Sequence, residues 1–476
     1  MTPWACEPTP LRALDAALLG AAAAAFGLIC RFAGPARGTA DDAFLAGRRL
    51  AWWEAGVALS SAEVSGLTLV AVPAAAFSGG FGYMLFFAGS LAGRAGAASL
   101  VSKLREERAV TVYGLAGKKF GSSWARAAAL LFCAARAVSA ALRLVAASVA
   151  LSLLTGLGPA WAALLLCAAA AAYTGYGGLR GVARASLLQA AVYLGACAAV
   201  VYYILNQTPG NLHGALSAAG EAGRLTLQDA GPWWSAGLSG AAGALAGFAA
   251  DHEFAQKLLA CRSDADARRA LGLAAALSAA TLLLLLAAGT SLLGFYHAHP
   301  ALAVPDRLDQ IFMHFAATVL PAPLRGLLAA AVFFAAVDLP LSALSAASWA
   351  DLGPGGARLS AHARWLLAAG WSAALFAAAL TMLGSAEPLS WAEQAWPLAS
   401  GPLLALTLAA CLRRPRPQHW AALAAAGACA GAVLALARLG AEGLDFGWIS
   451  AFGIAGCCAA AWAATLPREP AALDTI

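Results

Sequence analysis

Charged side chains are scarce in this sequence. Asp, Glu, Lys and Arg make up 11% of its 476 residues, whereas hydrophobic types make up 61% and the mean hydropathy is +0.73. Soluble domains carry roughly one quarter charged residues, so this shortage excludes an ordinary soluble protein. The net charge of +6 comes from short basic clusters beside apolar runs, which does not indicate nucleic-acid binding.

Motifs of the common enzyme and metal-binding classes are also absent. No CxxC pair occurs among the ten cysteines, and the adjacent Cys457 and Cys458 cannot form an ordinary disulfide. We expect the cysteines to be small apolar core residues. No nucleophile elbow, P-loop or dinucleotide fingerprint lies on a plausible strand–turn–helix unit. The sequence therefore predicts neither an enzyme nor an organic cofactor.

Apolar runs of about 20 residues recur along the whole chain, and each is long enough to cross a bilayer. The first run has no basic segment before it and is followed by others, so we interpret it as a span rather than a signal peptide. The pattern predicts an all-α polytopic membrane protein with about 13 transmembrane helices. The predicted spans are residues 12–33, 51–78, 82–102, 123–155, 158–176, 184–206, 232–256, 268–296, 322–350, 361–383, 387–411, 418–438 and 444–466.

The distribution of Lys and Arg predicts the orientation. With the N-terminus outside, most basic residues, Lys257 among them, fall in inner loops. The outer segments then hold only Arg12, Arg224, Arg307, Arg325 and Arg438. We expect a multi-pass protein of the inner (plasma) membrane with a cytoplasmic C-terminus. Residues 1–466 form one transmembrane domain, and 467–476 form a short cytoplasmic tail.

A weak internal repeat is visible. The stretch "WWEAGVALSSAEVSG" begins at Trp52, and "WWSAGLSGAAGALAG" begins at Trp233. An odd number of predicted spans separates the two starts, so they enter the membrane from opposite faces. This is typical of the inverted repeats that surround a midplane site in secondary transporters. Two Trp pairs at membrane interfaces can also match by chance.

Ionisable residues inside a span cost roughly 2.5–3.5 kcal/mol each at the helix centre. Only a few occur here, and we expect the arginines to pair with carbonyls or carboxylates between packed helices. These residues are Glu63, Arg94, Arg136, Arg143 and Asp338.

Asp338 lies near the middle of its apolar run, and Pro340 follows it two residues later. Proline has no N–H, so the Ala336 carbonyl loses its helical donor and the helix is expected to kink. Ser342 and Ser345 share a helical face with Asp338. A carboxylate, hydroxyls and released carbonyls suit a small hard cation. The alternative is a structural ion pair between Asp338 and Arg136 or Arg143.

Two further polar stretches stand out. "LSSAEVSGLTLVAVP" places Glu63, a glycine and a proline inside one span, which indicates a locally unwound helix lining a cavity; Glu63 either acts at the site or caps a kinked helix. "DHEF" places Asp251, His252 and Glu253 at the inner end of another span. Without the spacing of a zinc motif, these three are expected to be solvated residues at the interface.

Four stretches in order resemble the sodium/solute symporter family, which includes sodium–glucose, proline, sialic-acid and pantothenate carriers. They are "DDAFLAGRRLAWWEAGVALSSAEVSGLTLVAVPAAAF", "YTGYGGLRGVARASLLQ", "ADHEFAQKLLACRSDADARRAL" and "LRGLLAAAVFFAAVDLPLSALSAAS". The resemblance implies a LeuT-type fold, with five-plus-five inverted repeats at roughly 51–206 and 232–411 around a midplane site.

The resemblance also assigns site residues. The family's sodium is held by carbonyls that fall on Ser61, Val64 and Ala335, and by two hydroxyls that fall on Asp338 and Leu339. The family's substrate pocket falls near Glu63, Thr68, Phe87, Ala244 and Phe248.

This chain departs from the family pattern at the ion site. Asp338 and Leu339 replace the hydroxyl pair, and Ser186 replaces an aspartate that joins a further sodium site in some members, which would include Ser342. The carboxylate has thus moved between helices. This change has three alternative consequences. The site still binds sodium, now with a charged ligand; or it binds a proton instead; or the carrier is no longer coupled to an ion. Most sugar-gripping positions are apolar here, so a small organic acid, amino acid or similar metabolite is favoured over a sugar.

The sequence therefore predicts a cation-coupled symporter, with sodium or a proton as coupling ion, that imports a small organic solute by alternating access as a monomer or weak homo-oligomer in the lipid bilayer. A non-transporting membrane sensor of the same fold is the alternative. A membrane enzyme would require a metal bound at Asp251, His252 and Glu253.

Overall fold

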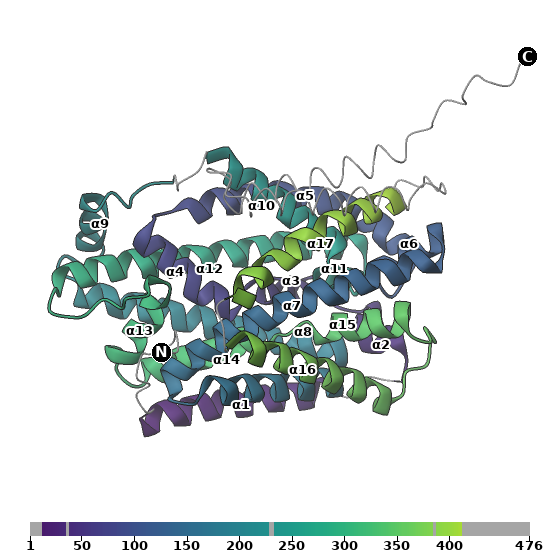
Figure 1. Cartoon of the computed structure of the whole chain (residues 1–476), viewed down its shortest axis with the longest axis horizontal. Coiled ribbons are helices and arrows are strands. Elements are labelled where there is room, and N and C mark those ends of the chain that lie inside the picture. Colours follow the sequence, from purple (N-terminus) through teal and green to yellow (C-terminus); the bar gives the residue numbers. More distant parts are fainter. Residues whose placement is uncertain (1–11, 35–37, 228–232, 384–386, 412–476) are drawn as a thin grey trace, which may run out of the picture.

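The computed structural model describes residues 12–34, 38–227, 233–383 and 387–411 (Figure 1). Regular structure in these ranges is helical, and only two isolated β-bridges, Thr39 with Arg358 and Leu50 with Cys261, interrupt it. The predicted all-α class is confirmed there. The helices are α1 (Ala13–Ala33), α2 (Ala40–Leu45), α3 (Trp52–Glu63), α4 (Gly66–Ser78), α5 (Gly82–Glu106), α6 (Val112–Phe120), α7 (Ser122–Thr155), α8 (Pro159–Gln207), α9 (Asn211–Glu221), α10 (Trp233–Ala250), α11 (His252–Leu259), α12 (Asp264–Ala298), α13 (Ile311–Thr318), α14 (Leu324–Val337), α15 (Leu341–Ala347), α16 (Ala361–Leu383) and α17 (Glu387–Cys411), with short 3₁₀ turns at Ala46–Arg48 and Leu308–Gln310 and a π turn at Ser348–Leu352.

By length and composition, seven described helical segments can cross a membrane, or eight with the bent α3–α4 pair. This confirms a polytopic membrane protein, but not the count of 13. The predicted spans 418–438 and 444–466 and the tail 467–476 lie outside the described residues. The six described cysteines (Cys30, Cys133, Cys167, Cys197, Cys261 and Cys411) are free and buried, as expected.

Helix α8 contains two predicted spans, 158–176 and 184–206. Gly178 interrupts it with φ 55° and ψ −155°, a conformation that glycine adopts most readily. A Cβ placed on Gly181 would lie 3.6 Å from the Tyr173 carbonyl oxygen. Residues eight apart in a straight helix are about 12 Å apart, so the chain folds back here. The glycine-rich "GYGGLRG" stretch is the turn between two antiparallel spans.

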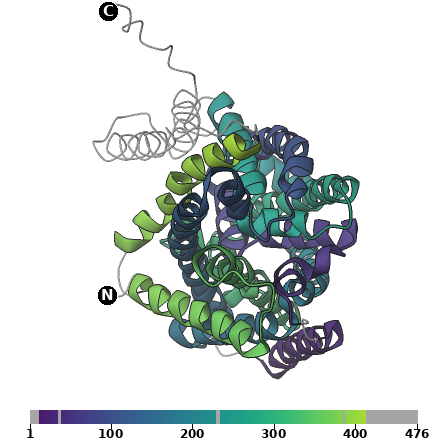
Figure 2. The same ribbon diagram turned by 90° about the vertical axis from the view of Figure 1, so that its right-hand side faces the viewer.

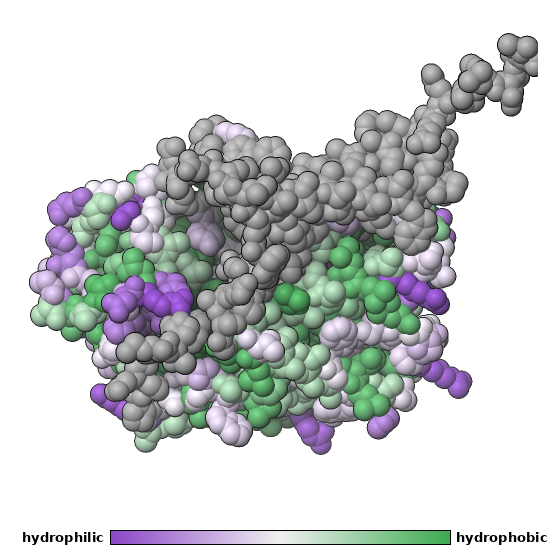
Figure 3. Space-filling view, in the orientation of Figure 1, coloured by the Kyte–Doolittle hydropathy of each residue, from purple (hydrophilic) through white to green (hydrophobic). Residues whose placement is uncertain are grey.

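The helices run mostly along the long axis of the molecule. Figures 1 and 2 show α5 and α10 on one side of the bundle and α1 and α16 on the opposite side. In Figure 3, many of the described residues visible in the middle of this face are apolar, and most strongly hydrophilic ones lie toward the two ends of the long axis. This distribution suits an apolar membrane core between two aqueous faces.

Helices α5 and α10 approach closely because small residues line both. A Cβ on Gly93 of α5 would lie 2.8 Å from the Ala244 Cβ of α10, and a Cβ on Gly240 would collide with the α5 backbone at Phe86. Small residues permit such contacts between membrane helices. The packing places two residues of the predicted substrate pocket, Phe87 and Phe248, on neighbouring helices.

Three helix pairs are separated by short breaks: α3–α4, α10–α11 and α14–α15. The segment Leu324–Leu352, which contains α14 and α15, is 94% buried over its most apolar window. Irregular backbone at membrane depth is stable only where protein or a water-filled cavity surrounds it. At each of the three breaks, backbone groups that a continuous helix would pair are therefore available to other partners.

Candidate ion and substrate site

The first broken helix releases backbone carbonyls, as predicted. Helices α3 and α4 meet at an angle of 63°. The Ser65 N–H donates to Thr68 Oγ1 at 3.2 Å, and the Thr68 N–H donates to Ser65 Oγ at 3.4 Å, so these two residues cap α4 reciprocally. In a continuous helix these N–H groups would serve the carbonyls of Ser61 and Val64. Both carbonyls therefore lose their helical donors.

The α14–α15 break has the same consequence. The Leu339 N–H donates to the Val337 carbonyl at 2.8 Å, so the Ala335 carbonyl loses its helical donor. Pro340 has no N–H, and the Ala336 carbonyl loses its donor as well. The predicted kink is confirmed. All three carbonyls that the family resemblance assigns to the ion are thus released by chain breaks, while the assignment itself stays a prediction.

Side chains from neighbouring helices satisfy other carbonyls at each break. Two tyrosine hydroxyls and one guanidinium act as donors. They form the hydrogen bonds Arg143 Nη2 to the Ala62 oxygen (3.0 Å), Tyr113 Oη to the Ala250 oxygen (3.0 Å) and Tyr173 Oη to the Val337 oxygen (3.2 Å). An unpaired buried carbonyl costs free energy, so these contacts hold the breaks in place.

Asp338 forms the first residue of the α14–α15 break and is 5% exposed. Its Oδ1 accepts a hydrogen bond from Tyr173 at 3.4 Å, and its buried Oδ2 has no hydrogen-bond partner. Within the described residues, Asp338 forms no ion pair with Arg136 or Arg143. The structural-pair interpretation of Asp338 is therefore wrong, because both arginines bind other carboxylates.

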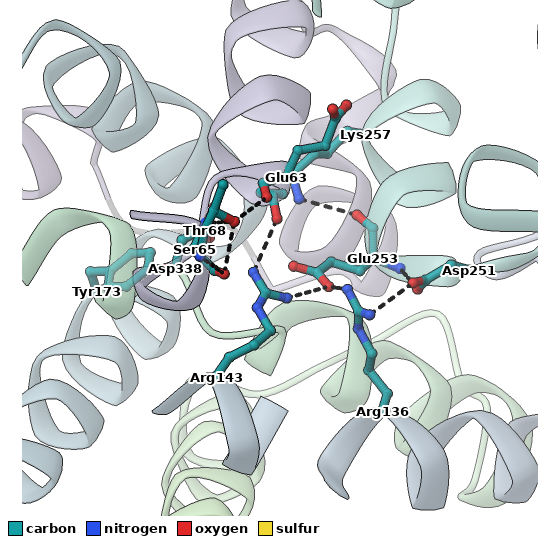
Figure 4. A network of polar contacts seen from close by, with 11 residues as sticks. Glu63, Ser65, Thr68, Arg136, Arg143, Tyr173, Asp251, Glu253, Lys257 and Asp338 are labelled. Carbon is teal, nitrogen blue, oxygen red and sulfur yellow. Dashed lines mark hydrogen bonds and ion pairs between the residues drawn. The ribbon is translucent and has the colours of Figure 1, made fainter. Parts of the chain in front are cut away.

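Arg136 and Arg143 of α7 reach the α10–α11 break (Figure 4). Arg136 pairs with Asp251 through Nη1 and Oδ2 at 3.2 Å and also with Glu253, while Arg143 Nη1 lies 3.7 Å from Glu253 Oε2. Asp251 also caps α11 by accepting the Glu253 N–H at 2.9 Å. The expectation that these arginines bind carboxylates and carbonyls between helices is confirmed.

The expectation of solvated residues at "DHEF" is wrong. Asp251 and His252 are 0% exposed and Glu253 is 2% exposed. Lys257, which the orientation argument counted in an inner loop, is 3% exposed. The error arose because the end of an apolar run was taken as the end of the span. Instead, the chain continues past a break at Asp251 into the buried helix α11, whose polar first turn packs against α7.

Glu63 binds Arg94 of α5 in a bidentate ion pair. The two guanidinium nitrogens lie 2.8 and 2.5 Å from the two carboxylate oxygens, and Ser278 of α12 donates to Oε2 at 2.9 Å. The Arg94 guanidinium carbon lies 5.9 Å from the Phe87 ring centre and 4.6 Å from that of Phe248. The Glu63–Arg94 ion pair therefore lies beside the aromatic rings of Phe87 and Phe248.

The other predicted site residues lie beside these contacts. Thr68 Oγ1 donates to the Glu63 carbonyl at 3.4 Å, and Ala244 packs against α5 at Gly93. Ser342 Oγ accepts from Gln256 of α11 at 3.1 Å. Ser61 Oγ donates to the Ser186 carbonyl at 3.2 Å, so a residue that the resemblance assigns to the ion contacts one of the positions where this chain departs from the family.

The Glu63–Arg94 pair was not predicted. The signal was present, because each residue places an unmatched charge inside a neighbouring span, and such charges usually pair. Sequence alone gave no depth or rotation for either helix, so several pairings among the five intramembrane charges were equally consistent with it.

The comparisons with known proteins agree with this geometry. A model of the sodium:solute symporter family matches residues 43–350. The chain belongs to this family. The match contains all three broken helix pairs and every residue assigned to the ion and substrate sites. No curated protein matches the chain at a significant level.

Solved structures share the fold of this symporter-family chain. A Na⁺-coupled sialic acid symporter in a substrate-bound outward-open state has a TM-score of 0.83 and 20% identity, with 95% of this chain and 97% of that chain covered. Mhp1, a nucleobase-cation-symport-1 family transporter, in a closed conformation with bromovinylhydantoin bound, has a TM-score of 0.55 and 15% identity (90% and 94% covered). MhsT in complex with L-phenylalanine has a TM-score of 0.52 and 15% identity (86% and 97% covered). At these identities the likeness establishes a transporter fold of the LeuT type.

Proposed function

We propose that this protein is a sodium-coupled symporter that imports a small organic solute by alternating access. Membership of the sodium:solute symporter family supports cation-coupled secondary transport. The observation that carries the proposal is the α14–α15 break, where the unpartnered Oδ2 of Asp338 and the released Ala335 carbonyl lie in one buried turn. Oxygen ligands of this kind replace the water shell of a small hard cation.

The proposed ion site combines the two broken helices α3–α4 and α14–α15. Its ligands are the carbonyls of Ser61, Val64 and Ala335, the Asp338 carboxylate and the Ser342 hydroxyl. The loss of helical donors at all three carbonyls supports this assignment. No enzymatic step is proposed, since the family and its structural relatives are transporters.

The proposed solute site lies around the Glu63–Arg94 pair, with Thr68, Phe87, Ala244 and Phe248. Two aromatic faces and a charge pair suit a small organic acid or an amino acid better than a sugar. Structural relatives bind sialic acid and L-phenylalanine, both of which carry a carboxylate. Helices α5 and α10, which carry Arg94, Phe87, Ala244 and Phe248, pack closely beside this site.

The proposed architecture is an inverted repeat of 51–206 and 232–411, within about 13 spans that place the N-terminus outside an inner membrane. Two observations support the repeat. Both Trp-led helices, α3 and α10, end at a break near the middle of the bundle. At each break, a side chain of another helix donates to a carbonyl in the last turn.

Uptake into proteoliposomes tests the proposal. Purified protein is given a panel of radiolabelled organic acids and amino acids under an imposed inward sodium gradient, an inward proton gradient or neither. We expect sodium-driven accumulation of at least one solute, reduced at least about 100-fold in Asp338→Asn because the charged ligand is lost. The matched control is Asp309→Asn, an exposed residue paired with Arg307, which leaves uptake unchanged.

Other outcomes separate the alternatives. Accumulation driven only by a proton gradient would mean that a proton, and not sodium, is the coupling ion at Asp338. Exchange without accumulation under any gradient would indicate an uncoupled carrier. Binding of a solute without any uptake would contradict symport and favour a membrane sensor of the same fold.

A further inference from the structure

Lys257 is a buried cation outside the proposed ion site. Its Nζ donates to the Glu253 carbonyl oxygen at 3.1 Å and lies 5.8 Å from the centre of the Phe254 ring. Among the described residues, no carboxylate oxygen lies within ion-pair distance of this ammonium. A buried charge without a direct counter-ion is costly, so the residue requires compensation from charges further away.

Asp338 supplies that compensation. Lys257 interacts electrostatically with Asp338 and, more weakly, with Asp251, and Arg143 is also within range of Asp338. The two helices are tied together beside Lys257, because Gln256 of α11 donates to Ser342 of α15 at 3.1 Å. Asp338 and Lys257, neither of which has an ion-pair partner among the described residues, therefore lie in the same part of the bundle, on different broken helices.

The central charges of the described bundle balance without a bound ion. Four basic side chains face four acidic ones in and around the three breaks. They are Arg94, Arg136, Arg143, Lys257, Glu63, Asp251, Glu253 and Asp338. A sodium ion held by Asp338 adds one positive charge, and Lys257 then loses its compensating partner. In a low-dielectric interior such like-charge repulsion weakens binding.

We propose that Lys257 is the built-in counter-cation of Asp338 and competes with sodium for that carboxylate, so that Lys257 sets the sodium affinity of the transporter. This inference rests on the proposed function and names a specificity-determining residue outside its ligand set. Since Lys257 lies on α11 and Asp338 at the start of the α14–α15 break, sodium binding replaces an attraction between these elements by a repulsion. Ion occupancy thereby changes the force between two broken helices that pack against one another.

Sodium-dependent heat stability tests the competition. The full-length protein in detergent is titrated with NaCl against KCl at constant ionic strength, and the melting temperature is recorded. Lys257→Met is expected to melt at a lower temperature than wild type without sodium, because Asp338 loses its counter-charge. Its half-maximal sodium concentration is expected to be at least about fivefold lower than that of wild type. Lys257→Arg keeps the charge and should behave as wild type.

Lys257→Gln, which can still donate to the Glu253 carbonyl, replaces Lys257→Met if that variant does not fold. The competition is wrong if removing the charge leaves the sodium dependence unchanged, or if Lys257→Arg shifts it as far as the neutral variants do. A sodium response that appears only in the neutral variants supports it, since Lys257 then excludes sodium altogether. If sodium affinity shifts as expected but no solute is taken up by wild type, the proposed symport fails while the competition stands.

Discussion

Two ion-pair systems among the described residues, one partly and one fully buried, differ in what they connect. The Glu63–Arg94 pair joins α3 to α5 through one bidentate contact, supported by Ser278. The second system joins α7 to the α10–α11 break, and there Arg136 and Arg143 share Glu253 while Arg136 also binds Asp251. In the first, each charge has its own partner. In the second, the carboxylates depend on shared cations.

The two systems therefore differ in how easily their ion pairs can rearrange. A bidentate pair has a single geometry and fixes the two helices that carry it. A cluster with shared partners can exchange contacts without leaving a charge unpaired, which suits an interface that rearranges. Under the proposed mechanism, we expect Glu63–Arg94 to persist through the transport cycle and the α7 cluster to change its pairing.

Removing Arg136 should have the largest effect on stability. Arg136→Met leaves Asp251 and Glu253, both nearly inaccessible to solvent, with Arg143 as the remaining ion-pair partner of Glu253 and none for Asp251 among the described residues. Breaking such a buried pair costs about 3–5 kcal/mol. Denaturant unfolding in detergent micelles measures the loss. Arg126→Met is the matched control, because Arg126 is an exposed arginine on the same helix and should change little.

Removing Arg94 should have an intermediate effect. Arg94→Met strips both charged hydrogen bonds from Glu63, whose side chain is 21% exposed and so keeps partial access to water. The free energy of unfolding should fall by about 1.5–3 kcal/mol. The double variant Glu63→Gln with Arg94→Met should lose less than the sum of the single variants. Strict additivity in the same unfolding assay would mean that the two residues do not act as a pair.

Removing the hydroxyl of either tyrosine at the breaks should have the smallest effect on stability. Tyr113→Phe and Tyr173→Phe each remove one donor to a carbonyl at a break, which costs about 1 kcal/mol. Only Tyr173 also donates to Asp338, so only Tyr173→Phe should alter sodium-dependent stabilisation. An equal change of sodium response in both variants would contradict the assignment of the ion to the α14–α15 break.

Several features could be read from the sequence. The length of the apolar runs indicated a helical membrane protein, and the unwinding after Glu63 and the kink at Pro340 followed from local backbone chemistry. The motifs predicted the family, and the match of the family model to residues 43–350 confirms it. The ligand and pocket residues came from the resemblance, and the structure adds their surroundings. Hydropathy averages over a window of residues and does not detect a helix break inside a polar stretch. For this reason the sequence did not predict the burial of Asp251, His252, Glu253 and Lys257.

The sequence by itself determined which residues carry charge into the bundle and where its helices break, because both depend on side-chain type and on N–H groups that proline or a capping residue removes. Only the tertiary structure decided which charges meet. A helix can rotate and shift in depth without changing its hydropathy. The pairing of Glu63 with Arg94, the binding of Arg136 and Arg143 by Asp251 and Glu253, and the isolation of Asp338 from direct cation contact therefore all depend on packing. That packing turned Asp338 from a candidate structural anion into the carboxylate for which sodium and Lys257 are proposed to compete.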